Sequence, residues 1–141
     1  DTEKINLNYL IRDVVKKYNS EQIGLSLEEN SMINIRPNSI KRCLSNLIDN
    51  ALIYGKKAQI ITKKTERNLL ILIDDNGPGI PKEIRDQLFK EFVTSGKESG
   101  TGLGLSIAKR FVDDHQGSID VYSVTGEGTT FTIVLPKLER A

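Results

Sequence analysis

Apolar residues recur along the chain at two spacings, and each spacing predicts one kind of secondary structure. In three stretches an apolar residue returns every three or four positions, as in helices that bury a single face. The second stretch is bounded by Pro37, which suits a first helical turn, and by Gly55, which suits a helix end. The predicted helices span about residues 10–18, 37–54 and 103–115, and a shorter helix begins at Pro81.

Elsewhere apolar and polar residues alternate, which is typical of strands with one buried face. The last two alternating stretches flank Gly126-Glu127-Gly128 and predict a closing hairpin. Since the chain shows no repeat, low-complexity tract or linker, we expect a single domain over residues 1–141. Its predicted fold is an α/β two-layer sandwich, in which a mixed, largely antiparallel sheet packs against about three helices. The predicted strands are 5–7, 23–27, 32–35, 58–62, 69–73, 118–123 and 129–135.

Charge balance and cysteine content exclude several classes of function. The 20 Lys and Arg residues are matched by 19 Asp and Glu, so no broad basic field is present for nucleic acid, and phosphate recognition has to be local. Cys43 is the only cysteine, which excludes an internal disulfide, and its place on an apolar helix face predicts a core residue. No apolar run is long enough to span a membrane. Because the chain begins at Asp1 rather than Met, we expect a cytoplasmic domain cut from a longer protein, with any membrane attachment upstream.

The glycine cluster Gly100-Thr101-Gly102-Leu103-Gly104-Leu105 precedes the last predicted helix. Glycines let backbone N–H groups approach a ligand closely, and a helix N-terminus adds partial positive charge, so the cluster suits a polyphosphate. It is not a Walker loop, because no Gly-Lys-Ser or Gly-Lys-Thr follows, and it lacks the third glycine of a dinucleotide fingerprint. Taken alone, the cluster is equally compatible with a flexible hinge.

A second cluster, Asp75-Asn76-Gly77-Pro78-Gly79, ends a predicted strand. A carboxylate at that position can accept a hydrogen bond from an exocyclic amine such as adenine N6, whereas guanine presents a carbonyl oxygen there. Asp75 is therefore a candidate for reading the base. The competing interpretation is an ordinary turn, which these residue types favour when nothing else is known.

Two amides, Asn46 and Asn50, lie four positions apart on the helix predicted over 37–54 and so share a face that flanks its apolar stripe. An amide oxygen can bind Mg²⁺ without repelling a triphosphate, and Mg²⁺ commonly combines few protein ligands with phosphate oxygens. The alternative is a pair of boundary asparagines that cap neighbouring loops. Asp49 points further toward solvent and is predicted to be a surface charge.

These clusters belong to a series whose order and spacing carry more information than any one of them. The series is Asn46-x-x-x-Asn50, Asp75-x-Gly77-x-Gly79, Phe89-x-x-Phe92 and Gly100-x-Gly102-x-Gly104. It resembles the N box, first glycine box, F box and second glycine box of histidine kinases. The segment His115-Gln116-Gly117 and the final hairpin, from Gly126 to Pro136, are also similar to that family. The resemblance covers nearly the whole chain and places it in the larger group of gyrase, HSP90 and MutL, which implies a Bergerat-type fold with ATP under a mobile lid.

The resemblance implies a role for each matching residue. Asn50 would hold Mg²⁺, and Asp75 would accept the adenine amine. Asn46 stands where the ATPases of the group carry a glutamate base, and an amide cannot accept that proton, so ATP would be kept for transfer; Asn46 and Asn50 are the expected catalytic residues. Tyr54 would pack near the nucleotide, or alternatively would be a core residue at the helix end. Lys97 would contact phosphate, or alternatively would be only solvated. The other expected nucleotide contacts are Tyr54, Gly77, Gly79, Ile80, Lys97, Gly100, Thr101, Gly102, Leu103, Gly104, Leu105 and Thr129.

The lid implied by the resemblance is short, running over 93–101, with Phe89 and Phe92 anchoring its base. The run Phe92-Val93-Thr94-Ser95 is most similar to sensor kinases of the nitrogen-regulation type. One departure is Ile53, which stands where related kinases often carry Lys or Arg; Lys56, Lys57 or Lys97 would have to supply that charge. The single histidine, His115, lies near a helix C-terminus, where an imidazolium would interact favourably with the helix dipole, so we expect a structural role.

The function implied is that of a histidine kinase catalytic domain, which binds Mg-ATP and donates the γ-phosphoryl group to a histidine on a separate dimerisation domain. A response regulator would be an indirect partner, and neither nucleic acid nor the membrane would be contacted. Two alternatives share the fold. One is a noncatalytic nucleotide-sensing or docking module, suggested by Ile53 and the missing acceptor helix; the other is a serine-phosphorylating anti-sigma-type kinase, against which Asn46 argues.

Overall fold

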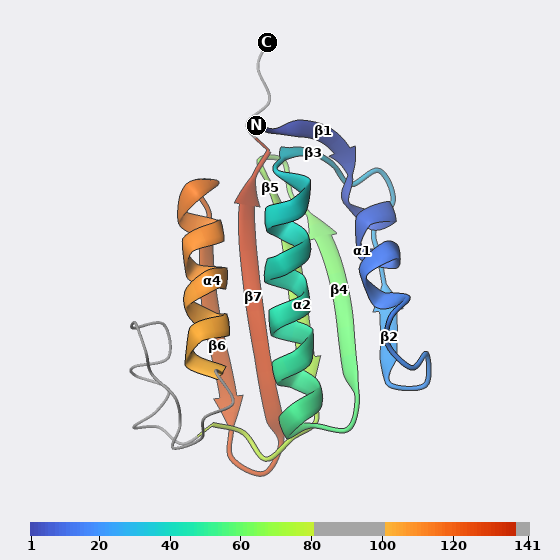
Figure 1. Ribbon diagram of the computed structural model, residues 1–141, viewed down its shortest axis with the longest axis vertical. Coiled ribbons are helices and arrows are strands. Elements are labelled where there is room, and N and C mark those ends of the chain that lie inside the picture. Colours follow the sequence, from blue (N-terminus) through green and yellow to red (C-terminus); the bar gives the residue numbers. More distant parts are fainter. Residues whose placement is uncertain (81–100, 138–141) are drawn as a thin grey trace.

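In the computed structural model, which describes residues 1–80 and 101–137, helices cover one face of a twisted sheet (Figure 1). The elements are β1 (Glu3–Asn6), α1 (Leu7–Val15), β2 (Ile23–Ser26), β3 (Met32–Ile35), α2 (Pro37–Tyr54), β4 (Ala58–Lys64), β5 (Asn68–Asp75), α4 (Thr101–Asp114), β6 (Ser118–Val124) and β7 (Gly128–Pro136). No helix within the described residues is both long and apolar enough to cross a bilayer.

The main sheet has five strands in the order β2-β4-β5-β7-β6. Strand β2 pairs with β4 in parallel, whereas the other three pairings are antiparallel. Strands β1 and β3 form a separate antiparallel pair beside α1. The predicted fold class, a two-layer sandwich with a mixed and largely antiparallel sheet, is confirmed.

Alternation along β5 shows how the sequence selects the buried face of this sheet. Leu69, Ile71 and Ile73 are at most 1% exposed and pack under the helices, while the residues between them are half-buried. Burying each such side chain contributes on the order of 2 kcal/mol. Asp75 continues the same alternation, so the pattern that builds the core also directs this carboxylate toward the helix side of the sheet.

Most predicted boundaries agree with the structure within two residues, and α2 agrees at both ends. Helix α1 has the predicted length but begins and ends three residues earlier than predicted. It ends at Val15 because the chain then enters a turn, in which the Tyr18 N–H donates to the Val15 carbonyl at 3.0 Å. Helix α4 begins at Thr101, two residues before the prediction. The short helix predicted from Pro81 lies outside the described residues.

Two polar predictions on α2 have different outcomes. Cys43 is fully buried, and burial raises the pKa of its thiol to about 12, as expected of an inert core residue. Asp49 is exposed as predicted, yet it is more than a solvated charge. Its carboxylate accepts a hydrogen bond from the Tyr18 hydroxyl at 2.6 Å, which ties α2 to the turn after α1.

His115 has the structural role that was predicted. The side chain is 7% exposed, and its Nε2 accepts the backbone N–H of Arg36 at 3.1 Å. Since Nε2 accepts, Nδ1 is the ring nitrogen that donates, and it lies 3.0 Å from the Phe111 carbonyl oxygen. The ring thus joins the end of α4 to the start of α2, a contact between distant segments of the chain.

Replacing this ring is expected to destabilise the fold. His115→Ala leaves the Arg36 N–H without its acceptor and removes a ring that packs 4.3 Å, between centroids, from Phe111. We expect the free energy of unfolding, measured by urea denaturation, to fall by about 2–3 kcal/mol. The control is Asp114→Ala, at the exposed neighbouring position, where a change within about 0.5 kcal/mol is expected. Equal stability of the two variants would contradict the role assigned to the ring.

Candidate functional site

Four segments that are far apart in the sequence meet at one end of the molecule, the lower end in Figure 1. They are the C-terminal end of α2, the N-terminal end of α4, the loop over 76–80 that follows β5, and the turn between β6 and β7. A helix N-terminus and a turn rich in backbone N–H groups supply partial positive charge at this end. The fold therefore brings together the motifs that the sequence analysis singled out.

Asp75, the last residue of β5, is held by backbone N–H groups. Its Oδ1 accepts the N–H of Gly77 at 2.8 Å, and the N–H of Thr129 on β7 also donates to the carboxylate. Burial raises the pKa of the Asp75 carboxyl above its usual value, and the neighbouring charge of Asp74 adds to the rise, while the two N–H donors oppose it. The carboxylate is thus fixed in direction and partly desolvated, which strengthens its interaction with a donor.

The loop over 76–80 rests on the β6–β7 turn, and two glycines make this contact possible. Gly79 has a φ of +86°, and a Cβ atom there would lie 2.8 Å from the carbonyl oxygen of Val124. Gly128 has a φ of +140°, and a Cβ atom there would clash with the carbonyl oxygen of Asp75. The Gly126 N–H also donates to the Pro78 carbonyl at 2.8 Å. The turn is therefore a rigid support for the loop.

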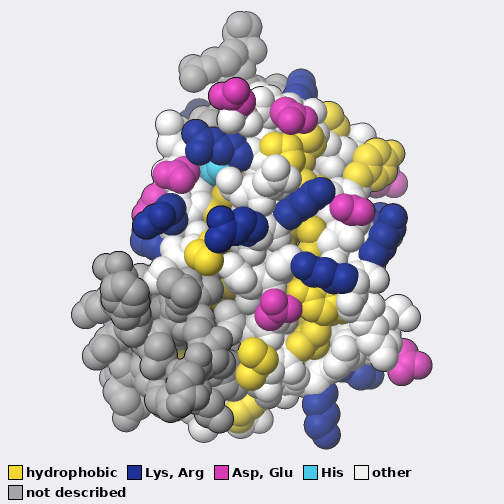
Figure 2. Space-filling model, in the orientation of Figure 1, with side chains coloured by type: hydrophobic (Ala, Val, Ile, Leu, Met, Phe, Trp, Pro, Cys, Tyr) yellow, Lys and Arg dark blue, Asp and Glu magenta, His cyan; other side chains and the backbone are white. Residues whose placement is uncertain are grey.

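The two amides of α2 occupy different environments. Asn50 is 7% exposed, and its Nδ2 donates to the backbone carbonyl of Asn46, one turn earlier, at 3.0 Å. An amide held by its nitrogen presents only its oxygen to a cation. The side chain of Asn46 is half-buried and borders a hollow of about 310 Å³ among the helices, on a face where cationic side chains are spread widely (Figure 2). The hollow is lined by Lys17, Lys41, Arg42, Ser45, Asn46 and Ile107.

Two residues of this region were missed by the sequence analysis. Asn76 was taken only as a turn residue, but its Oδ1 accepts the N–H groups of Lys56 at 2.9 Å and Lys57 at 3.2 Å, so it ties the loop after β5 to the segment after α2. Ser123 is 7% exposed, and its Oγ accepts the Ile80 N–H at 2.7 Å. Both partners are about 20 or more residues away, and local pattern does not reveal such pairings; a small polar residue at a core position of β6 is the one available signal.

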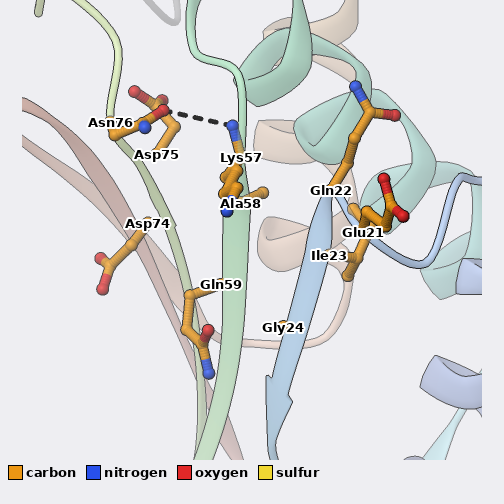
Figure 3. A pocket seen from close by; sticks show the side chains of 10 residues that line it. All are labelled: Glu21, Gln22, Ile23, Gly24, Lys57, Ala58, Gln59, Asp74, Asp75 and Asn76. Carbon is orange, nitrogen blue, oxygen red and sulfur yellow. Dashed lines mark hydrogen bonds between the residues drawn. The ribbon is translucent and has the colours of Figure 1, made fainter.

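A polar pocket of about 420 Å³ lies where β2 and β4 begin and β5 ends (Figure 3). Asp74 and Asp75 line it together with Glu21, whereas Lys57 is its only cationic side chain. This excess of carboxylates disfavours a triphosphate, so we do not place one here. Its other lining residues are Gln22, Ile23, Gly24, Ala58, Gln59 and Asn76.

The structure describes the remaining predicted site residues to different extents. Leu105 is 1% exposed and belongs to the core, so only its backbone is open to a ligand. Ile80 is half-buried against the core, and Thr129 is 5% exposed and reaches Asp75 through its N–H. Lys97 and Gly100 lie outside the described residues. For Tyr54 at the end of α2, and for Thr101, Gly102, Leu103 and Gly104 in the first turn of α4, the structure gives the backbone position but does not describe the side chain.

Comparison with known families gives one match that covers most of the chain. Residues 35–139 match the model of the histidine kinase-, DNA gyrase B- and HSP90-like ATPases. The matched range contains α2, the loop after β5, α4 and the closing hairpin. It therefore includes every element that meets at the candidate site.

Characterised relatives are longer sensor proteins. The sensor histidine kinase GtrS of Pseudomonas aeruginosa is 31% identical over 143 residues, which cover 98% of this chain and 30% of that protein. The histidine kinase/phosphatase NtrB of Vibrio alginolyticus is 44% identical over 120 residues, covering 85% of this chain and 29% of that protein. The sensor protein SrrB of Staphylococcus aureus is 46% identical over 105 residues, covering 68% of this chain and 18% of that protein. The chain thus spans less than a third of the length of these relatives.

Solved structures have the same fold. The catalytic domain of the histidine kinase ThkA superposes with a TM-score of 0.82 at 30% identity, covering 97% of this chain and 98% of that one. The histidine kinase AdeS of Acinetobacter baumannii superposes with a TM-score of 0.80 at 26% identity, covering 99% of this chain and 68% of that one. The likeness extends over almost the entire chain in both cases.

The support given by the hairpin turn can be tested with a matched pair of glycine variants. Gly128→Ala introduces a Cβ atom against the Asp75 carbonyl, whereas Gly126→Ala, also at positive φ, meets nothing within 4 Å. We expect Gly126→Ala to lower the free energy of unfolding by about 1 kcal/mol. Gly128→Ala should cost about 1–3 kcal/mol more and shift the amide resonances of Asp75 and Asn76. Equal losses of stability, with no shift at Asp75, would contradict the packing described.

Proposed function

Because the chain belongs to the histidine kinase-, DNA gyrase B- and HSP90-like ATPase family, we propose that it binds ATP with Mg²⁺ and donates the γ-phosphoryl group to a histidine of a dimerisation domain. The observation that carries this proposal is the Asp75 carboxylate, fixed by the N–H groups of Gly77 and Thr129 at the end of β5. The relatives GtrS and NtrB are themselves named as sensor histidine kinases. Residues 1–141 would then be a catalytic and ATP-binding domain, with the acceptor histidine in another part of a longer protein.

The base site follows from the chemistry of the fixed carboxylate. An ionised carboxylate only accepts hydrogen bonds, so it pairs with the N6 amine of adenine and leaves the carbonyl of guanine without a donor. Desolvation makes that mismatch more costly. Gly77, Gly79 and Ile80 lie on the loop beside Asp75, where the backbone can pass close to the base, and Thr129 completes the site from β7.

The phosphate site would lie between the N-terminal end of α4 and the C-terminal part of α2. Thr101, Gly102, Leu103 and Gly104 form the first turn of α4, and the free N–H groups of such a turn suit phosphate oxygens. The backbone of Leu105, with Gly100, Lys97 and Tyr54, would extend this site. The amide oxygen of Asn50 fits a Mg²⁺ ion that takes its other ligands from phosphate and water, and the ion would neutralise phosphate charge.

Transfer, rather than hydrolysis, is favoured by the residue at position 46. A glutamate in this place could accept a proton from water, but the amide of Asn46 cannot, so bound ATP would be protected from rapid hydrolysis. The side chain of Asn46 also lines the hollow on the helical face, from which an acceptor domain could approach. A response regulator would then receive the phosphoryl group from the histidine, at the cytoplasmic side of a parent protein that is free or membrane-anchored. Relatives as different as NtrB and SrrB match well, so the nitrogen-regulation subfamily stays a prediction.

A noncatalytic docking module is the second candidate, and Ile53 favours it. The side chain is 58% exposed near the end of α2, where a cation would have helped to hold phosphate. An apolar side chain supplies no charge to hold phosphate, so this position favours a module that does not depend on phosphate transfer. A serine-phosphorylating kinase of the same fold is a third possibility, which acid-stable phosphoserine on a partner would reveal.

The base contact is tested by Asp75→Asn. This change replaces an acceptor oxygen by an N–H donor, so ATP binding measured by calorimetry should weaken by about a hundredfold or more. Unfolding should remain cooperative. The control is Asp74→Asn, the preceding residue of β5, whose carboxylate accepts the Thr130 hydroxyl and is not assigned to the base. Unchanged ATP affinity in Asp75→Asn would count heavily against this site.

The reaction itself is tested by adding the acceptor domain of the full-length parent protein together with radiolabelled ATP and Mg²⁺. Acid-labile phosphate on the acceptor histidine is expected, and it should disappear with Asn50→Ala or when the metal is chelated. Tight ATP binding without any transfer would instead identify the docking module.

A further inference from the structure

We propose that Ser123 is a positioning residue for nucleotide binding: its buried hydroxyl holds the far end of the loop over 76–80, so that the base site is formed before the nucleotide arrives. The inference rests on the proposed function and extends it to a residue of β6. It starts from a buried polar side chain that the nucleotide contacts described above do not use. Ser123 is 7% exposed, and its Oγ accepts the Ile80 N–H at 2.7 Å.

Strand register places Ser123 in line with Asp75, the carboxylate proposed to bind the adenine base. Ser123 pairs with Thr129 across β6 and β7, and Thr129 pairs with Asp75 across β7 and β5. The three residues therefore form one row across neighbouring strands, which we call the base row. Within it the Ser123 Oγ lies 3.1 Å from the Thr129 Oγ1 and 3.3 Å from the Gly128 carbonyl oxygen.

The two outer members of the base row hold opposite ends of the same loop. Asp75 accepts the N–H of Gly77 at the start of the loop, and Ser123 accepts the N–H of Ile80 at its end. Between these bonds the chain contains Pro78 and Gly79, and Gly79 has a φ of +86°. Because glycine is conformationally permissive, such a segment would lose entropy on binding a ligand unless both ends were already fixed.

The hydrogen bond to Ser123 therefore fixes the position of Gly79 and Ile80, beside the base, and does not act at the phosphates. Its loss would leave a partly buried N–H without this acceptor and release the loop end beside the base. A residue that acts only on the base side must affect adenosine, ADP and ATP by the same factor. This equality separates the proposed role from an effect at the phosphates.

The experiment compares Ser123→Ala with wild type for adenosine, ADP and ATP, using amide chemical shifts as the readout of binding. All three dissociation constants should rise by about tenfold, the effect of one lost buried hydrogen bond. Hydrogen exchange at the Ile80 amide should accelerate in the ligand-free protein, and Ser123→Thr, which keeps a hydroxyl, should restore affinity. Ser118→Ala, at an exposed position of the same strand, is the control and should leave binding unchanged.

The outcomes separate the two hypotheses. Unchanged affinities in Ser123→Ala, a loss confined to ATP, or unchanged exchange at Ile80 would overturn the role of Ser123 while leaving the nucleotide site in place. If wild type itself binds no adenosine, ADP or ATP, the proposed function fails as well.

Discussion

The structure depends on one constraint, a carboxylate that has to stay ionised and aimed while it is partly removed from water. Asp75 meets it at the end of β5, where the N–H groups of Gly77 and Thr129 offset part of the desolvation that raises its pKa. Burying such a group lowers the stability of the ligand-free fold, and the loss is offset only when a hydrogen-bond donor binds. The surrounding segments can be understood as the support that keeps this carboxylate in place.

That support comes from the sheet rather than from the loop alone. Because β5, β7 and β6 are neighbours, Asp75 and Thr129 are paired across one strand boundary and Thr129 and Ser123 across the next. The hairpin turn can approach the loop only because Gly79 and Gly128 lack a Cβ atom. Asn76 then links the loop to the segment after α2, so the elements bearing Asn50 and Asp75 are fixed relative to each other.

Much of this could be predicted from the sequence, because the decisive signals were local. Apolar spacing with Pro37 and Gly55 defined α2, and alternation defined β5 up to its terminal carboxylate. What local pattern could not show was any pairing between distant segments. The structural role of His115 depends on a hydrogen bond from the backbone of Arg36, and that of Ser123 depends on one from the backbone of Ile80. The end of α1 was predicted three residues too late for a similar reason, since Tyr18 is apolar enough to continue the periodicity but its hydroxyl donates to Asp49 on another helix.

The most direct test of this account is a crystal structure of the domain with Mg²⁺ and a nonhydrolysable ATP analogue. We predict that the adenine N6 amine lies within hydrogen-bond distance of the Asp75 carboxylate and that the triphosphate lies at the first turn of α4. A base bound elsewhere, or an Asp75 carboxylate that faces only solvent in the complex, would contradict it.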